Sequence, residues 1–543
     1  MRDRRLLWAA LVTVSLATSI ASATGDASPP SASFDALPMD LLATVAIGPL
    51  DVEAIPISEG HGARRVALAV PLDIDVAGAA TWESVPSGGA IARLRVQSAD
   101  ALFLSFKFST FTLASGVEVY FVSEHQQYAA GPFGVADTKE TGRFGSPVVP
   151  GESAVIEVFV PDAIPAPFAL NLESASHGFA NALGMTSIPD RAPGASTGTS
   201  AFGGPFACQR DINCPEGAPY QLEKQAFAEG YDGEFICTGQ LLNNTAQDGR
   251  NLYLTAAHCE FFLDPSTLSF YWNYENSTCT SSDAPLVFTT GATDLYHSIW
   301  PFGDLQLFEL DGGDLESSFD VTYLGWRRDG VAPTQSATLG FPADKPLQIM
   351  IDDDPAIDCA AGCGLDSFGT DFWRIDDWEV GLTEGGSSGG ALLDQDHRVV
   401  GVLTGGVGAT CGSFEWDEFF KLSAEWPALA PHLDPLGTGA LTVDAWDGSS
   451  MLTSFVRGDV NADGNLDVAD VIATLDALFG GIPTVDCDDA GDVNDDGSVD
   501  ISDPISALTH LFSGGPPPPS PYPLCGSDST GDGLACTWFP SCP

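Results

Sequence analysis

Basic residues are scarce in this 543-residue chain. It has 21 lysines and arginines against 74 aspartates and glutamates, which gives a formal net charge of −53 at pH 7. Nucleic acids and anionic membrane surfaces attract proteins through clusters of positive charge. The composition therefore argues against both as partners, and it favours an acidic, solubilising surface combined with sites for a hard cation.

Long apolar runs are also missing beyond the first residues. Arg2, Arg4 and Arg5 precede an apolar run from residue 6 to about 17, and the small residues at 21–23 form a site for signal cleavage after Ala23. The run is too short for a membrane-spanning helix, which needs roughly 20 apolar residues. We therefore expect residues 1–23 to be a signal peptide and the protein to be secreted, with no membrane span.

Cysteine is absent from the first 207 residues. The twelve cysteines all follow, eight of them between residues 208 and 411 and four between 487 and 542. Disulfides form in oxidising compartments, so these cysteines agree with export. Their uneven distribution, together with shifts in composition, predicts domains at 24–200, 201–447 and 448–543. A linker rich in Pro, Gly, Ser and Thr at 189–205 is an expected site of maturation cleavage.

Residues 24–200 have the pattern of an all-β domain. Apolar and polar residues alternate at 104–109 and at 168–172, and further apolar runs occupy 117–122 and 154–160. Short strands bounded by glycine and proline predict a β-sandwich. His125 and His177 have no neighbours at the spacing of a triad or a metal site. We therefore expect a non-catalytic domain, either a prodomain that assists folding or a retained binding module.

A glycine-rich loop at residues 383–391 (Thr-Glu-Gly-Gly-Ser-Ser-Gly-Gly-Ala) carries the first indication of catalysis. Ser388 needs a positioned base to become a nucleophile, and the N–H groups of Gly386 and Ser388 can form an oxyanion hole. The expected base is His258, which follows an apolar strand in the segment Leu-Thr-Ala-Ala-His-Cys at 254–259. Histidine before serine is the chymotrypsin-type order. Each segment alone is more often structural, but together they predict a serine peptidase.

Acids are so plentiful that the third member of the triad needs its own argument. Asp304 precedes residues 305–310, which alternate like a strand. A buried carboxylate at a strand start can hold the tautomer of His258 and stabilise its imidazolium form. Asp294, Asp314 and Asp320 are the competitors, and we expect them to be solvated loop acids.

The segment from about 206 to 447 resembles the bacterial lysyl endopeptidases. Besides residues 254–259 and 381–389, the matching motifs are Cys-Gln-Arg-Asp-Ile-Asn-Cys-Pro-Glu-Gly (208–217), Cys-Thr-Gly-Gln-Leu-Leu-Asn-Asn-Thr (237–245), Tyr-Trp-Asn-Tyr-Glu-Asn-Ser-Thr-Cys (271–279), Tyr-Leu-Gly-Trp (323–326) and His-Leu-Asp-Pro (432–435). The resemblance implies a double β-barrel with the active site between the barrels, and it places Asp304 at the triad acid. It also implies three disulfides, Cys208–Cys411, Cys214–Cys279 and Cys237–Cys259. Cys359 and Cys363 have no counterpart in the family, and we expect them to pair with each other.

The same resemblance implies a basic side chain in the substrate. In the lysyl endopeptidases, an aspartate just beyond the cysteine that matches Cys411 lies at the base of the S1 pocket, and Asp417 stands at that place. A buried carboxylate without a partner is costly, so a substrate Lys or Arg would be selected by supplying one. Either residue satisfies the carboxylate, so Lys and Arg stay open. Alternatively, Asp417 is a surface acid beside Glu415 and Glu418, and the specificity is not basic. Thr404 replaces a histidine of the family.

An internal repeat occupies the acidic C-terminal part. Residues 459–470 recur at 492–503, an offset of 33 residues. Each copy places oxygen-bearing side chains at loop positions 1, 3, 5, 9 and 12 and glycine at position 6, with a backbone carbonyl expected at position 7. This pattern is typical of calcium loops. The expected ligands are Asp459, Asn461, Asp463, Asn465, Asp467, Asp470, Asp492, Asn494, Asp496, Ser498, Asp500 and Asp503.

Aspartate at position 12 and a helix after each loop resemble a dockerin. The resemblance implies structural calcium and a cohesin-like or cell-surface partner. Apolar side chains on one face of each helix predict a small core, built from residues 471, 472, 475, 478, 479, 505, 508 and 512. Residues 457–459 spell the cell-adhesion tripeptide Arg-Gly-Asp, but a calcium ligand explains Asp459 better. Two disulfides with open pairing are expected among Cys487, Cys525, Cys536 and Cys542.

These patterns predict a mostly β, secreted serine endopeptidase that cleaves after Lys or Arg. A β-sandwich-like prodomain would precede a chymotrypsin-like double β-barrel, and a small α-helical, dockerin-like calcium module would follow it. No cofactor is expected for catalysis. The competing hypothesis is a catalytically silent protein that uses the peptidase fold as a binding scaffold in an extracellular assembly.

Overall fold

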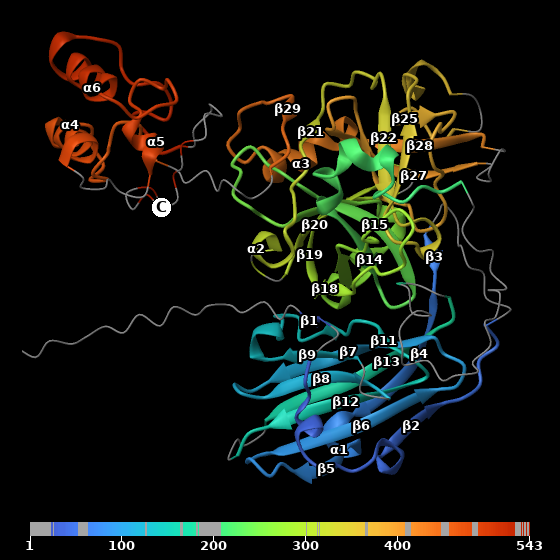
Figure 1. The fold of residues 1–543 in the computed structure, drawn as a ribbon. Helices are drawn as coiled ribbons and strands as arrows, with labels where there is room; N and C mark the ends of the chain where they lie inside the picture. The colour runs from blue at the N-terminus through green and yellow to red at the C-terminus, as the bar shows by residue number, and fades with distance from the viewer. Residues whose placement is uncertain are drawn as a thin grey trace, which may run out of the picture.

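The structure is a computed structural model of the chain (Figure 1). It describes residues 23–24, 27–52, 63–124, 128–162, 167–180, 183, 208–299, 301–311, 313, 315–363, 367–407, 414–446, 455–480, 487–526, 534, 536, 539 and 542. The expected signal peptide, except Ala23, and the whole of the expected linker at 189–205 lie outside these residues. Among the described helices, none is both long and apolar enough to cross a membrane.

The amino-terminal domain is a sandwich of two sheets (Figure 1). One sheet has the order β2 (Thr44–Ile47), β6 (Ala90–Ser98), β12 (Ser153–Val160), β8 (Glu118–Ser123) and β9 (Ala129–Phe133), with β5 (Thr81–Ser84) also on β6. The other has the order β10 (Phe144–Gly145), β7 (Phe103–Leu113), β13 (Phe168–Gly178) and β4 (Ala67–Asp75), with β11 (Val149–Pro150) also on β7. The four predicted strands coincide with β7, β8, β12 and β13.

Aromatic side chains join the two sheets of the sandwich. The alternation in β7 turns its phenylalanines inward, and Phe106 and Phe108 meet Phe121 of β8 at ring-centroid distances of 5.8 and 6.0 Å. Such pairs add to the stabilisation that burial already gives. His177 is buried and bonds to the Ser98 hydroxyl at 2.8 Å, which agrees with its expected structural role.

The second domain begins with a sheet that carries the histidine side of the site. Its order is β1 (Ala23–Thr24), β18 (Val287–Thr290), β17 (Ser269–Trp272), β14 (Phe227–Tyr231), β15 (Phe235–Leu242), β16 (Leu252–Thr255), β20 (Leu305–Leu310) and β19 (Ala292–Ser298), with β3 (Arg64–Arg65) also on β15. The short helix α2 (Leu315–Phe319) follows β20. Strands β1 and β3 come from the amino-terminal part of the chain, so that part contributes to the sheet of the second domain.

A second sheet carries the serine side of the site. Its order is β23 (Gln348–Asp352), β22 (Ser336–Gly340), β26 (Ala391–Leu393), β27 (Val399–Val407), β28 (Trp416–Lys421), β25 (Phe372–Ile375) and β24 (Ile357–Asp358). β21 (Trp326–Arg327) pairs with β27 and with β29 (Thr442–Val443), and helix α3 spans Trp426–Leu433. The two sheets are the half-barrels of the expected mostly β peptidase fold (Figure 1).

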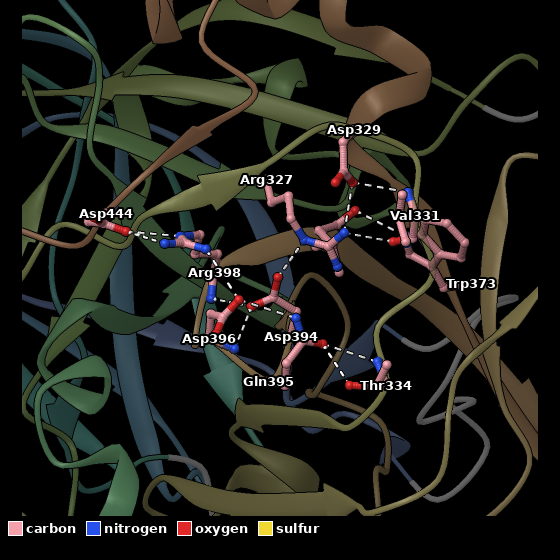
Figure 2. A network of polar contacts seen from close by, with 11 residues as sticks. Arg327, Asp329, Val331, Thr334, Trp373, Asp394, Gln395, Asp396, Arg398 and Asp444 are labelled. Carbon is pink, nitrogen blue, oxygen red and sulfur yellow. Dashed lines mark hydrogen bonds and ion pairs between the residues drawn. The ribbon is translucent and has the colours of Figure 1, made fainter.

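A buried ion pair fixes the strand that follows the glycine-rich loop at residues 383–391 (Figure 2). Arg327 in β21 donates from Nε to Asp394 at 2.5 Å, directly after β26, and from Nη1 to Asp329 at 2.7 Å. The other oxygen of Asp394 accepts the backbone N–H of Arg398 at 2.9 Å, which closes the turn into β27. Because β26 starts three residues after Ser388, this network anchors the chain that leaves the nucleophile loop.

The C-terminal part is small and helical. It contains α4 (Val468–Leu475), α5 (Asp488–Gly491) and α6 (Ser502–Ser513), and its core includes Val471, Val493 and Ala507. The predicted apolar faces are only partly buried: Ile472, Phe479, Ile505, Leu508 and Phe512 are exposed, Phe479 by 74%. The expectation of a core from both faces is therefore wrong for these residues, because α4 and α6 pack through other positions, among them the small Ala507.

Candidate active site

Two antiparallel strands bring the expected base and acid together. β16 ends at Thr255, which pairs with Gln306 in β20. His258 follows β16 in a single 3-10 turn, Ala257–Cys259, and Asp304 directly precedes β20, so both lie at one edge of the sheet. Asp304 accepts from Nδ1 of His258 and from its backbone N–H, each at 2.8 Å.

The environment of Asp304 keeps it ionised. Its side chain is buried, and burial alone would raise its pKa. The charge and hydrogen bonds of His258 and the hydroxyl of Thr404 outweigh burial, and the pKa of Asp304 lies below its usual range. Nε2 of His258 is buried and has no hydrogen-bond partner among the described residues, so this nitrogen is left to face a reacting group.

The other candidates for the acid of the triad do not lie at His258. Asp294 pairs with His297 at 2.6 Å, and Asp320 accepts from the side chain of Gln225 at 3.3 Å. Asp314 lies outside the described residues. Of the two competitors that can be placed, neither contacts His258, and the geometry singles out Asp304.

The glycine-rich loop at residues 383–391, called the nucleophile loop because it carries Ser388, packs against the strands that lead to His258. Thr238 in β15 donates its backbone N–H to the carbonyl of Ser388 and its hydroxyl to the carbonyl of Gly386, both at 2.8 Å. A Cβ on Gly389 would lie 2.8 Å from the backbone nitrogen of Ala256, two residues before His258. Only glycine permits this approach, and φ of Gly389 is +84°. Ser388 is thereby held beside the turn of His258.

Backbone donors are available in the same loop. Gly386 has a φ of +102°, which glycine adopts without strain. Within the described parts of the chain, the backbone N–H groups of Gly386 and Ser388 have no acceptor. Unused N–H groups beside a nucleophile can hold a developing oxyanion. Thr238 was not singled out from the sequence, although it lies in the matching motif at 237–245.

Disulfides close the segments around the site. Cys214–Cys279, Cys237–Cys259 and Cys359–Cys363 are formed as expected, and the second ties the turn of His258 to β15. Cys208 is disulfide-bonded, but its expected partner Cys411 lies outside the described residues. The sequence left the pairing of the four C-terminal cysteines undecided, and the structure contains the disulfides Cys487–Cys536 and Cys525–Cys542.

Asp417 is a buried acid beside the nucleophile loop. Its side chain is in β28, the residue is 2% exposed, and its Oδ2 accepts from Nε1 of Trp378 at 2.8 Å and from the hydroxyl of Thr383 at 2.6 Å. Burial raises its pKa to about 6, and these two hydrogen bonds offset only part of that effect. Since Thr383 precedes Ser388 by five residues, the acid adjoins the catalytic loop.

The alternative interpretation of Asp417 as a surface acid is therefore wrong. Its neighbour Glu418 is also buried, but it has a cation, Nε of Arg374 at 2.9 Å, whereas Glu415 is exposed. The contribution of Trp378 was missed because nothing in the local sequence connects it with a strand 39 residues away.

The two C-terminal loops have the same internal geometry. In the first, Asp459 accepts the N–H groups of Asp463 and Gly464 at 3.0 and 2.8 Å, and Asp470 accepts those of Asn461 and Asp467. The second repeats these bonds with Asp492 and Asp503, and both loops have a positive φ at position 6.

The donor set of these loops fits a hard cation. The aspartates at positions 1 and 12 are buried, and Oδ1 of Asn494 is buried with no partner among the described residues. Carboxylate and amide oxygens of this kind suit calcium. Among the described residues, the groups of three or more His, Cys, Asp and Glu side chains with ligand atoms within 4.8 Å of one another lie outside these loops.

The Arg-Gly-Asp tripeptide is inaccessible. Arg457 is fully buried and donates to the carbonyl of Asp492 at 2.7 Å, and Asp459 is also fully buried. A cell-adhesion role needs both side chains at the surface, so the structure agrees with its rejection.

Comparisons with known proteins match two segments of the chain to domains of one enzyme family. Residues 62–179 match the family description "Lysyl endopeptidase N-terminal domain", and residues 202–420 match "Lysyl endopeptidase, C-terminal domain". The lysyl endopeptidase of Pseudomonas aeruginosa is 27% identical over 383 residues, which are 65% of this chain and 77% of that protein.

Solved structures similar to the chain include two proteases. The thermostable serine protease AL20 from an extremophilic microorganism is 12% identical, with 40% of this chain and all of that chain covered and a TM-score of 0.29. Protease Anisep from Arthrobacter nicotinovorans is 14% identical, with 41% and 99% covered and a TM-score of 0.29. This chain is therefore a serine endopeptidase, and two of its segments are similar to the two domains of the lysyl endopeptidases.

Proposed function

We propose that this enzyme is secreted and cleaves peptide bonds after Lys or Arg by means of Ser388, His258 and Asp304. The observation that carries the proposal is the pairing of His258 with buried Asp304 beside a loop that presents Ser388 and two unused N–H groups. Disulfides through the peptidase domain support export, because they form in oxidising compartments.

The first half of the reaction is acyl transfer to the enzyme. Nε2 of His258 removes the proton of Ser388 as Oγ attacks the scissile carbonyl, and Asp304 stabilises the imidazolium that forms. The N–H groups of Gly386 and Ser388 hold the oxyanion. His258 then protonates the leaving amine, the C–N bond breaks, and the acyl group stays on Ser388.

The second half restores the enzyme. Water enters, His258 takes its proton, and the resulting hydroxide attacks the acyl carbon. Collapse of this intermediate releases the new carboxyl end of the substrate and returns the proton to Ser388.

Asp417 supplies the specificity. It is buried, it has two neutral hydrogen-bond donors, and among the described residues it has no cation. Burial raises its pKa, and the hydrogen bonds of Thr383 and Trp378 offset only part of that effect. A Lys or Arg side chain before the scissile bond would provide the partner, and a neutral side chain would leave the charge unpaired.

Active-site labelling tests the triad. A fluorophosphonate should label the purified enzyme at Ser388 and should not label Ser388→Ala. Labelling should also be much slower in His258→Ala, since the base is then missing. Equal labelling of wild type and Ser388→Ala would reject the proposed nucleophile.

The C-terminal part is proposed to bind two structural calcium ions and a protein partner. Calcium would be held by the loops of Asp459 and Asp492, whose buried oxygens fit it. Exposed apolar residues occur at equivalent positions of the two repeats, 33 residues apart: Val468 with Ile501, Ile472 with Ile505 and Phe479 with Phe512. Such a duplicated apolar surface supports a docking role, with a cohesin-like or cell-surface protein as the partner.

A further inference from the structure

A short strand of the amino-terminal part is inserted beside the catalytic histidine. β3 pairs antiparallel with the start of β15, Arg65 opposite Phe235 and Arg64 opposite Ile236 (Figure 1). Farther along β15, at Gln240–Leu242, the partner is β16, which leads to His258. β3 therefore adds a second partner to β15, near the point where β16 turns away.

The residue before this strand touches the surroundings of the base. Ala63 is buried in the same apolar cluster as Cys237 and Cys259, whose disulfide holds the turn of His258. In the proposed mechanism His258 protonates the leaving amine, so the substrate beyond the scissile bond must pass over this histidine. β3 pairs with the two residues that directly precede Cys237, and the disulfide of Cys237 holds the turn of His258.

The guanidinium of Arg64 enters an acidic pocket of the peptidase domain. Its Nε donates to Oδ2 of Asp344 at 2.8 Å. Glu229 is fully buried next to this pair, and Oδ1 of Asp344 and both carboxylate oxygens of Glu229 have no hydrogen-bond partner among the described residues. Burial raises the pKa of Glu229 and of Asp344, while the charge of Arg64 lowers both.

This pocket borders the oxyanion side of the nucleophile loop. Ala343, adjacent to Asp344, donates its backbone N–H to the carbonyl of Gly385 at 2.8 Å. A Cβ on Gly386 would lie 2.6 Å from the carbonyl oxygen of Phe341. The pocket of Asp417 instead meets the loop at Thr383. The loop therefore has two acidic sites, one proposed for the residue before the scissile bond and one without an assigned role.

We propose that β3 occupies the part of the cleft that receives the substrate beyond the scissile bond, and that Asp344 with Glu229 forms a second basic subsite there. In the uncleaved chain Arg64 fills this subsite and holds the peptidase inactive. Once β3 has left, the open edge of β15 would pair with a substrate strand, and Asp344 would select an Arg or Lys in it.

The energetics favour an exchange of one cation for another. A buried carboxylate that loses its partner is costly, so departure of Arg64 leaves Asp344 and Glu229 in need of a positive charge. A substrate arginine restores the pair and also gains the backbone hydrogen bonds that β3 made. An alanine at the same place gains only the latter. This inference depends on the proposed function, because it assigns substrate direction from the role of His258.

Two sets of variants of the full chain test the proposal. In the first, Arg64→Ala should raise kcat/KM for an internally quenched peptide at least tenfold. Arg65→Ala, which removes a guanidinium from the same strand but not the one on Asp344, should give no comparable increase, and Arg64→Lys should stay close to wild type. Equal rates for Arg64→Ala and Arg65→Ala would overturn the inhibitory role.

The second set measures selectivity in the Arg64→Ala background. Peptides with Lys before the scissile bond carry Arg or Ala at each of the four positions after it, and one position should favour Arg at least tenfold. Adding Asp344→Asn, which preserves shape and removes charge, should bring that ratio near one. An unchanged ratio in Asp344→Asn would overturn the subsite.

A lysyl anilide separates this inference from the proposed function. It has no residue after the scissile bond, so its hydrolysis reports on the triad and on Asp417 alone. Failure of the Arg64→Ala variant to hydrolyse the anilide would overturn the proposed function and this inference with it. Hydrolysis of the anilide without any preference for Arg beyond the bond would overturn only the inference.

Discussion

The carboxylate of Asp417 accepts a 2.6 Å hydrogen bond from the hydroxyl of Thr383, five residues before Ser388. A strand of the second sheet and the nucleophile loop are thus connected through a buried acid. Because burial raises the pKa of Asp417 to about 6, this connection has a cost at neutral pH that a neutral side chain would not have. In the proposed function, a substrate Lys or Arg would supply the positive charge that this acid lacks among the described residues.

Replacement of this acid should stabilise the empty enzyme. The folded state holds a proton on Asp417 between its ordinary pKa of 3.8 and about 6, while the unfolded chain loses it, so stability falls as pH rises through this window. Asp417→Asn should then be more stable than wild type above pH 6, by up to about 3 kcal/mol, and equal to it near pH 4. Urea unfolding at both pH values measures the difference.

A matched variant is Asp376→Asn, which removes an exposed carboxylate from the same domain. It should change the free energy of unfolding by less than about 0.5 kcal/mol at either pH. A stabilisation of Asp417→Asn that is the same at pH 4 and pH 8 would contradict the assignment of the cost to ionisation.

Asp304→Asn should retain the fold and lose activity. The amide can still occupy the space of the carboxylate, but it neither fixes the required tautomer of His258 nor stabilises the imidazolium. We expect kcat to fall about 10⁴-fold with little change in KM. Steady-state kinetics measures this, and Asp294→Asn, whose carboxylate pairs with His297 instead, should keep kcat within about twofold. A comparable loss in both variants would contradict the role of Asp304.

Arg327→Ala should destabilise the peptidase domain. It leaves Asp394 buried without its cation at the end of β26, and such a loss costs about 3–5 kcal/mol. Arg398→Ala is the control, because its partner Asp444 is exposed and the pair contributes less than about 1 kcal/mol. Both ion pairs are drawn in Figure 2. Thermal unfolding compares the two variants, and equal losses of stability would contradict a larger contribution from the buried Arg327 pair.

Calcium should bind the C-terminal loops without taking part in catalysis. Titration calorimetry of the full chain should give two ions per chain, one after Asp459→Ala and one after Asp492→Ala. The rate of peptide hydrolysis should be the same before and after chelation. Asp353→Ala, in the acidic group formed with Asp352, Asp354 and Glu379, serves as the control and should leave two sites. Two ions bound in both loop variants would place calcium elsewhere.

Local sequence patterns predicted the strands and turns that depend on residues close together in the chain. The structure contains the strands predicted around Phe106 and after Asp304. It also contains the tight turn that the glycines around Ser388 predicted. The order of His258, Asp304 and Ser388, together with the family resemblance, predicted a triad, and in the structure each of the three lies within three residues of a strand end.

Contacts between distant segments were less accessible from the sequence. The bond between Trp378 and Asp417 depends on the pairing of β25 with β28, and the contact of Arg64 with Asp344 spans 280 residues. The helical faces with Ile472 and Ile505 were predicted to be buried because periodicity shows an apolar face but not its partner. Packing between elements decides such cases, and no local pattern records it.

The central claim is that Ser388 cleaves after a basic residue held by Asp417. Digestion of a defined peptide mixture, with cleavage sites mapped by mass spectrometry, tests it most directly. We predict cuts after Lys or Arg that are absent with Ser388→Ala and lose their basic preference with Asp417→Ser. Cuts after neutral residues in the wild-type digest, or an unchanged basic preference in Asp417→Ser, would contradict the account.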